Sequence, residues 1–147
     1  WAKNNKVTLW YSGVEAYPVE GEIITICLKE IGVNQVQDLR FFSAFIYGST
    51  QVLDNFTLDP IHAFWADINF KEAYDVVFYD AFGPRAQSEL WTLANFQIAF
   101  DALKLGGTLV TYCAKGQVKR DLKSVGFTVE SRPGPPGKRE MTVALKS

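Results

Sequence analysis

One stretch of the sequence, from Tyr74 to Pro84, restricts the possible folds more than any other. It reads YDVVFYDAFGP, an apolar run that ends on Asp80 and then breaks at a Gly-Pro pair. A short Val- and Phe-rich run bounded by turn residues predicts a buried strand. In an open α/β sheet, ligands bind outside the carboxyl ends of the strands, which makes Asp80 the first candidate functional residue. Asp before Gly-Pro is also ordinary turn chemistry, in which the carboxylate caps backbone amides.

The rest of the chain alternates between predicted strands and predicted helices. Strands are expected at residues 7–14, 61–66, 75–79, 108–113, 127–132 and 140–145, and helices at residues 19–31, 38–46, 87–105 and 115–124. Gly32, the pair Gly106-Gly107 and Gly126 are expected to end three of these helices. This order predicts a Rossmann-like α/β sandwich, with a mostly parallel sheet and a C-terminal antiparallel strand.

Composition limits the class of protein. The chain has 147 residues, of which 48% are hydrophobic and 21% charged, and this suits a single globular domain. No apolar run approaches the ~18 residues that cross a bilayer, so no membrane association is expected. Cys27 and Cys113 lie in apolar segments, which predicts buried, reduced thiols in a cytoplasmic protein. His62 lies in an apolar run and is expected at the core or edge of the sheet, and no metal-ligand spacing is present, so no metal is expected.

Charge is distributed unevenly along the chain. Residues 1–100 carry 6 Lys or Arg and 12 Asp or Glu, whereas residues 101–147 carry 9 and 4. A basic C-terminal third suits a polyanion such as RNA. A solvated helix and loop surface is the alternative explanation.

Three carboxylates fall at or just after the ends of predicted strands: Glu15, Asp67 and Asp80. Parallel strands bring such residues to the same edge of a sheet. A carboxylate after the second strand of a nucleotide-binding sheet can accept both ribose hydroxyls, which is the placement of Glu15. Asp67, one strand further on, is placed to bond an adenine amino group. Together the three indicate a nucleotide site.

Residues 75–92 (DVVFYDAFGPRAQSELWT), 106–127 (GGTLVTYCAKGQVKRDLKSVGF) and 132–141 (RPGPPGKREM) identify a family. Together they resemble the tRNA 5-methylaminomethyl-2-thiouridine methyltransferases, the MnmC-type methyltransferase domain. The segment Glu15-Ala16-Tyr17-Pro18 is similar to the acidic motif on the second strand of that family.

The resemblance implies a class I S-adenosylmethionine methyltransferase fold and methylation of the aminomethyl group on a modified wobble uridine in tRNA. It implies that Glu15 holds the cofactor ribose, that Asp67 lies by the adenine and that Asp80 lies at the reacting centre. The cofactor-binding residues implied are Glu15, Ala16, Asp67, Asp80 and Ala81, with Asp80 also catalytic. The substrate-binding residues implied are Phe82, Pro84, Lys115, Lys138 and Arg139. An oxidoreductase partner that acts on the same base is a further expectation.

Aromatic and basic residues extend this hypothesis. Tyr79, Phe82 and Trp91 are candidates to stack on a splayed-out base, although Trp91 also fits the core stripe of a helix. Seven basic residues of the C-terminal third are candidates for phosphate contacts: Lys115, Lys119, Arg120, Lys123, Arg132, Lys138 and Arg139.

The sequence departs from the family pattern at its front. The glycine-rich motif E-x-G-F-G-T-G and the strand that carries it are missing, so residues 1–147 are expected to form a single, N-terminally incomplete methyltransferase domain. Two alternatives stay open: a methyltransferase of another RNA or small-molecule acceptor, and a non-catalytic module that binds RNA or a partner. A nicotinamide-dependent dehydrogenase is disfavoured, because its glycine fingerprint is missing too.

Overall fold

The computed structural model of the chain describes residues 7–30, 48–137 and 139–147. The chain divides into two compact units, Trp1–Trp65 and Ala66–Ser147, and each is described by itself. The helix predicted at residues 38–46 lies outside the described residues.

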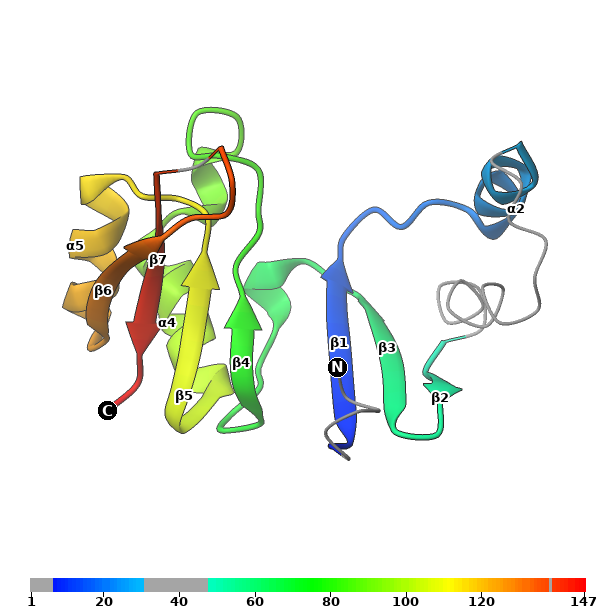
Figure 1. The fold of residues 1–147 in the computed structure, drawn as a ribbon, viewed down its shortest axis with the longest axis horizontal. Helices are drawn as coiled ribbons and strands as arrows, with labels where there is room; N and C mark the ends of the chain where they lie inside the picture. Colours follow the sequence, from blue (N-terminus) through cyan, green and yellow to red (C-terminus); the bar gives the residue numbers. More distant parts are fainter. Residues whose placement is uncertain (1–6, 31–47, 138) are drawn as a thin grey trace. The chain divides into compact units, whose positions relative to one another are not determined.

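The first unit contains a three-stranded sheet and one described helix (Figure 1). Strands β1 (Leu9–Glu15) and β3 (Phe56–His62) are parallel, whereas β2 (Thr50–Leu53) pairs antiparallel with β3 through a tight turn. Helix α2 (Gly21–Glu30) follows β1, close to the predicted bounds. Because β1 and β3 run parallel and in register, Glu15 and His62 end at the same edge of this sheet.

The strand predicted at residues 61–66 is wrong in position. The strand found there, β3, begins at Phe56 and contains Pro60. Proline lacks a backbone N–H and is tolerated where a strand has no neighbour on its N–H side. Here β2 pairs only with Phe56–Leu58, so Pro60 lies beyond the reach of β2. The predicted strand therefore began five residues too late and ended four residues beyond β3.

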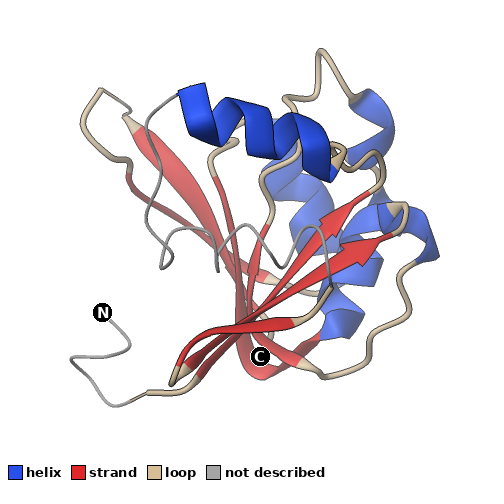
Figure 2. Cartoon of the chain, turned by 90° about the vertical axis from the view of Figure 1, so that its right-hand side faces the viewer, coloured by secondary structure: helices blue, strands red, loops and turns tan. Residues whose placement is uncertain are grey.

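The second unit contains a four-stranded sheet in the order β4-β5-β7-β6 (Figure 1). Its strands are β4 (Tyr74–Phe78), β5 (Leu103–Thr111), β6 (Thr128–Pro133) and β7 (Glu140–Leu145). Strand β4 is parallel to β5, and the remaining pairs are antiparallel. Helices α4 (Leu93–Ala102) and α5 (Gly116–Val125) contact each other and the sheet, and they lie on the same side of it (Figure 2).

The Rossmann-like α/β class is confirmed, because helices flank sheets that contain parallel strand pairs. The detail of a mostly parallel sheet is wrong for the described strands, since two of their five pairings are parallel and three are antiparallel. The C-terminal antiparallel pair is confirmed as β6 and β7.

The helix predicted at residues 87–105 is shorter than expected. A 3-10 turn, η2 (Ser88–Leu90), precedes α4, whose first turn is capped by the Thr92 hydroxyl accepting from the Asn95 amide. The helix ends at Ala102, and the next residue, Leu103, already has the extended backbone of β5. Gly106 and Gly107 therefore lie inside a strand rather than after a helix.

Helix α5 matches its prediction closely. It buries Val118 and Leu122 and turns its charged residues outward. Gly126 ends it with φ of 120°, a conformation open to glycine, and its amide donates to Leu122 and Lys123.

Asp101, near the end of α4, makes part of the stability of the second unit depend on pH. Its carboxylate accepts hydrogen bonds from Lys71 and Gln97, and these hold its pKa below the usual value, with Lys71 the larger cause. A depressed folded-state pKa contributes stability above the unfolded pKa of ~3.9 and loses it as the pH falls through the folded value. We expect Asp101→Asn to lower the unfolding free energy near neutral pH by about 0.5 kcal/mol, because the pair is partly exposed.

Urea unfolding at several pH values measures this effect. The difference between Asp101→Asn and the parent is expected to vanish once the pH is below the folded pKa. Asp121→Asn is the matched control, because that carboxylate bonds neutral Gln117. A difference for Asp101→Asn that stays constant over the whole acid range would contradict the prediction.

Candidate functional site

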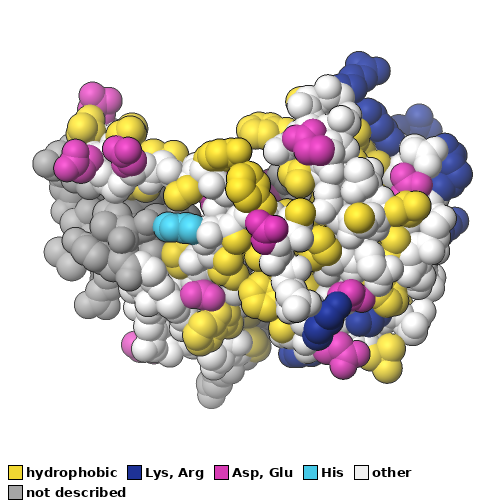
Figure 3. All heavy atoms as spheres, turned by 180° about the vertical axis from the view of Figure 1, so that it is seen from behind, with side chains coloured by type: hydrophobic (Ala, Val, Ile, Leu, Met, Phe, Trp, Pro, Cys, Tyr) yellow, Lys and Arg dark blue, Asp and Glu magenta, His cyan; other side chains and the backbone are white. Residues whose placement is uncertain are grey.

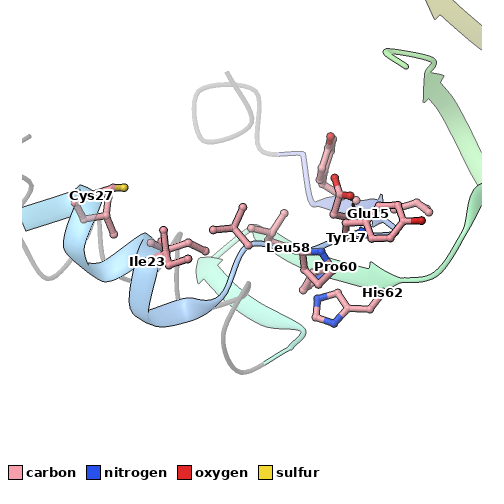
Figure 4. A pocket seen from close by; sticks show the side chains of 14 residues that line it. Glu15, Tyr17, Ile23, Cys27, Leu58, Pro60 and His62 are labelled. Carbon is pink, nitrogen blue, oxygen red and sulfur yellow. Dashed lines mark hydrogen bonds between the residues drawn. The ribbon is translucent and has the colours of Figure 1, made fainter. Parts of the chain in front are cut away.

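A pocket of about 580 Å³ lies in the first unit, between α2 and the strands β1 and β3 (Figure 4). This volume is within the range of small-molecule sites. Most of its lining is apolar, including Ile23 and Cys27 from α2 and Leu58 from β3. Cys27 is exposed, which corrects the prediction of a buried thiol, whereas Cys113 is buried as predicted.

The polar groups of this pocket gather at one end, where β1 and β3 finish (Figure 4). Glu15 is exposed and lies opposite His62 in the strand register. One carboxylate oxygen of Glu15, Oε1, accepts from the Tyr17 amide at 2.9 Å. In the described part of the chain, its Oε2 has no hydrogen-bond partner. The tyrosine ring packs edge-on against Phe64, with centroids 5.6 Å apart.

His62 and Tyr17 line this pocket but were not predicted as site residues. His62 is exposed as the last residue of β3, whereas it was expected at the core or edge of the sheet. The error in the position of the strand hid it, because a strand over residues 61–66 places His62 near its beginning. Tyr17 lies two positions after the acidic residue Glu15, and this closeness in sequence was the available indication that Tyr17 lies at the same site.

In the second unit, Asp80 lies just beyond the carboxyl end of β4, as predicted. The Tyr79 amide donates to the Val110 carbonyl and extends the pairing of β4 with β5 up to this point. Asp80 is exposed. Because β4 and β5 are parallel, the segment after Thr111 on β5 ends at the same edge, and the Tyr112 hydroxyl donates to the Ala81 carbonyl at 2.9 Å.

Of the three aromatic stacking candidates, only Phe82 is exposed, at 76%. Tyr79 is buried, and its hydroxyl donates to the Leu90 carbonyl. Burial also raises the pKa of the Tyr79 phenol far above its ordinary value. Trp91 is buried in the same cluster, as its helical spacing suggested. Stacking on a base by Tyr79 or Trp91 is therefore excluded in this conformation.

The other predicted residues occupy varied positions. Asp67 ends the 3-10 turn η1 (Trp65–Asp67) and is exposed, so it does not end a strand as predicted. Ala81 and Pro84 are half-buried in the segment after β4, and Ala16 is half-buried in the bend after β1. Glu15 and Ala16 belong to the first unit, and Asp67, Asp80, Ala81 and Pro84 to the second.

Basic side chains gather on one part of the surface (Figure 3), and α5 with the following strands supplies several of them. Lys115 precedes the first turn of α5 and is exposed, as are Lys123 and Arg139. Lys119 instead binds Ser131 and Glu140, and its hydrogen bond is the main cause of the lowered pKa of Glu140. Lys138 lies outside the described residues.

No group of three or more His, Cys, Asp or Glu in the described part of the chain is arranged to hold a metal ion. None of the helices described is both long and apolar enough to cross a membrane.

A family model described as S-adenosyl-L-methionine-dependent methyltransferase matches residues 48–147. The chain belongs to this methyltransferase family. The matched part includes β3, Asp80 and the whole second unit. It also crosses the boundary between the two units at Trp65 and Ala66.

Sequence relatives carry a more specific name. The chain is 40% identical over 70 residues to the tRNA 5-methylaminomethyl-2-thiouridine biosynthesis bifunctional protein MnmC of Cupriavidus metallidurans, which covers 48% of this chain and 10% of that protein. It is 36% identical over 80 residues to the protein of the same name from Hahella chejuensis, which covers 54% of this chain and 12% of that protein. The chain thus spans about a tenth of the curated relatives it matches.

A solved structure shares the fold. MnmC2 from Aquifex aeolicus matches with a TM-score of 0.65 and 23% identity, over 98% of this chain and 46% of that one. At this identity the likeness supports the α/β methyltransferase fold. The resemblance stated from the sequence is therefore confirmed at the level of family and fold.

The pocket of the first unit fits part of the cofactor that defines this methyltransferase family. A ribose presents two neighbouring hydroxyl donors, and Oε2 of Glu15 is an acceptor with no described protein partner. The edge-on pair of Tyr17 and Phe64 adds aromatic surface beside this carboxylate. The donor and acceptor set therefore suits the nucleoside part of S-adenosyl-L-methionine.

Proposed function

We propose that this chain transfers a methyl group from S-adenosyl-L-methionine to the aminomethyl nitrogen of a modified wobble uridine in tRNA. The observation that carries the proposal is the family match over residues 48–147, which includes an exposed carboxylate beyond the carboxyl end of a parallel strand. The names of the two curated relatives support the tRNA substrate. Both units would then belong to one methyltransferase domain, as the match across their boundary suggests.

The proposed roles of the cofactor-binding residues follow from their chemistry. When bound, the cofactor supplies a methyl group on a positively charged sulfur. Glu15 would accept the ribose hydroxyls, and Ala16 would line the same turn beside it. Asp67 is proposed to lie toward the adenine, and Ala81 toward the methionyl end.

Asp80 has the main proposed role at the reacting centre. Methyl transfer is a single in-line displacement, so alignment of the two reactants matters more than covalent catalysis. The acceptor amine must be unprotonated to attack. Asp80 would accept a hydrogen bond from the amine N–H, orient the nitrogen and take up its proton. Phe82 would stack on the splayed-out base, with Pro84 beside it.

The proposal also covers partners and location. The curated relatives are named as bifunctional proteins, which supports an oxidoreductase that acts on the same base, either fused or separate. A cytoplasmic location follows from a tRNA substrate.

Calorimetric titration of S-adenosyl-L-methionine tests the cofactor site. We expect Glu15→Gln to weaken binding about 10- to 100-fold, because the amide cannot accept two hydrogen bonds as a charged group does. Glu20→Gln is the control, since it removes the same charge from an exposed residue outside the pocket lining. Equal affinities for Glu15→Gln and the parent would place the cofactor elsewhere, and no binding by the parent would contradict the methyltransferase proposal for this chain.

Binding of tRNA tests the basic surface. We expect Lys115→Glu combined with Arg139→Glu to weaken tRNA binding and to make the slope of log K against log[salt] shallower by about 1 per lost phosphate contact. Cofactor affinity should stay unchanged. Lys104→Glu is the control, because Lys104 pairs with Asp75 at the start of β4. Equal losses of tRNA and cofactor binding would indicate that the two basic residues are structural.

A further inference from the structure

The segment that follows β4 is held by two aromatic side chains that come from different elements. The Trp91 indole Nε1–H donates to the Phe82 carbonyl at 2.7 Å. The Tyr112 hydroxyl donates to the neighbouring Ala81 carbonyl at 2.9 Å. Trp91 directly follows η2, whereas Tyr112 directly follows β5. The two consecutive carbonyls that follow Asp80 are therefore hydrogen-bonded to two separate parts of the second unit.

These two donors belong to a packed aromatic cluster. The rings of Trp91 and Tyr112 meet edge-on, with centroids 6.2 Å apart, and Tyr79 meets Trp91 at 5.4 Å. Phe96, which is fully buried on α4, packs against Trp91 and Tyr79. Trp91 is buried and Tyr112 is half-buried in this cluster, and closely packed rings have few accessible rotamers, so their polar atoms are held in place.

Asp80 lies within electrostatic reach of this cluster. The pKa of the Tyr112 phenol is raised, first by burial and then by electrostatic interaction with the nearby Cys113 and Asp80. Phe82 is 76% exposed, while its backbone carbonyl accepts the hydrogen bond from Trp91. The cluster thus holds the backbone while the two side chains of interest, Asp80 and Phe82, stay accessible.

We propose that Trp91 and Tyr112 are positioning residues: they fix the Ala81–Phe82 backbone and so set the directions of the Asp80 carboxylate and the Phe82 ring. This inference rests on the proposed function, which places Asp80 and Phe82 at the reacting centre. A one-ångström displacement of a reacting group can cost on the order of 100-fold in rate, so the orientation of this segment has a measurable kinetic effect.

The sharpest test compares two isosteric changes in the same cluster. Tyr112→Phe removes the hydroxyl that donates to the Ala81 carbonyl, whereas Tyr79→Phe removes a hydroxyl that donates to the Leu90 carbonyl and not to the Ala81–Phe82 backbone. We expect Tyr112→Phe to lower kcat for methyl transfer about tenfold with little change in the KM for cofactor, whereas Tyr79→Phe lowers thermal stability without lowering kcat. Trp91→Phe, which keeps a ring and removes the indole donor, should lower kcat in the same way as Tyr112→Phe.

A second readout does not need activity. Amide hydrogen exchange of residues 80–83 should be faster in Tyr112→Phe and Trp91→Phe than in Tyr79→Phe. Unchanged exchange in the first two variants, or a kcat equal to that of Tyr79→Phe, would overturn the positioning role. Lack of methyl transfer in the parent protein would instead contradict the proposed function, and the exchange measurement would still decide whether the two aromatic residues hold the segment.

Discussion

Replacement of Asp80 by Asn is expected to lower the rate of methyl transfer to tRNA by about 10²- to 10⁴-fold, the usual contribution of a group that accepts a proton in the transition state. The asparagine side chain has nearly the same shape, but its amide is a far weaker proton acceptor and carries no charge. A carboxylate also offsets the positive charge that passes from sulfur to nitrogen during the transfer. Because Asp80 is exposed beyond the end of β4, the substitution should leave the unfolding free energy almost unchanged.

Strand β4 itself supplies the matched control for this experiment. Asp75 lies near the opposite end of the same strand, is exposed, and pairs with Lys104 at 2.9 Å. Asp75→Asn removes the same charge from the same element and should leave single-turnover transfer from bound cofactor unaffected. Equal rates for Asp80→Asn and the parent protein would remove Asp80 from the reacting centre.

The position of Asp80 just beyond the end of a strand could be predicted from the sequence because its signal is local. An apolar run that ends on an acid before Gly-Pro defines the strand, its end and the turn within a few residues. The bounds of α5 were equally local, since Gly126 and the spacing of Val118 and Leu122 lie in one short segment. Such features need no knowledge of what packs against them.

The errors occurred where one pattern fits two structures. Leu103 continues the apolar stripe of α4, yet it is a fully buried residue of β5. Leu103 would be buried either as the last residue of the helix or as the first residue of the strand, so the spacing of apolar residues cannot show where the helix ends. The adjoining Gly106 adopts φ of 81° inside the strand, and a glycine with positive φ is equally expected after a helix.

The hydrogen bonds of the aromatic cluster could not be predicted. Trp91 and Phe82 are nine positions apart, and Tyr112 and Ala81 are 31 apart. Neither separation corresponds to a repeat of helix or strand. Core packing, one of the two roles considered for Trp91, is confirmed by its burial. No partner was predicted for its indole N–H, and that partner, the Phe82 carbonyl, links the core to the candidate site.

Lys146 makes a contribution to stability that the sequence does not reveal. Helix α4 ends in carbonyls that lack donors from within the helix. Other groups supply them: Leu103 to Ala99, Lys146 to Phe100, Glu72 to Asp101 and Ala73 to Ala102. Lys146 is buried, and its ammonium donates to the Phe100 carbonyl at 3.0 Å and to the Leu103 carbonyl at 2.7 Å. It also lies 4.7 Å from the centroid of the Phe100 ring.

Lys146→Met is therefore expected to lower the unfolding free energy by about 2–4 kcal/mol, because two carbonyls lose a charged donor at a site that water reaches poorly. Methionine keeps most of the apolar stem, so packing changes little. Urea unfolding followed by circular dichroism measures the loss, and Lys104→Met is the control, with an expected cost below about 1 kcal/mol for its exposed ion pair. Lys146→Arg retains the charge and donors and should recover part of the loss. If Lys146→Met were no more costly than Lys104→Met, the end of α4 would be held by its backbone contacts with Glu72 and Ala73 alone.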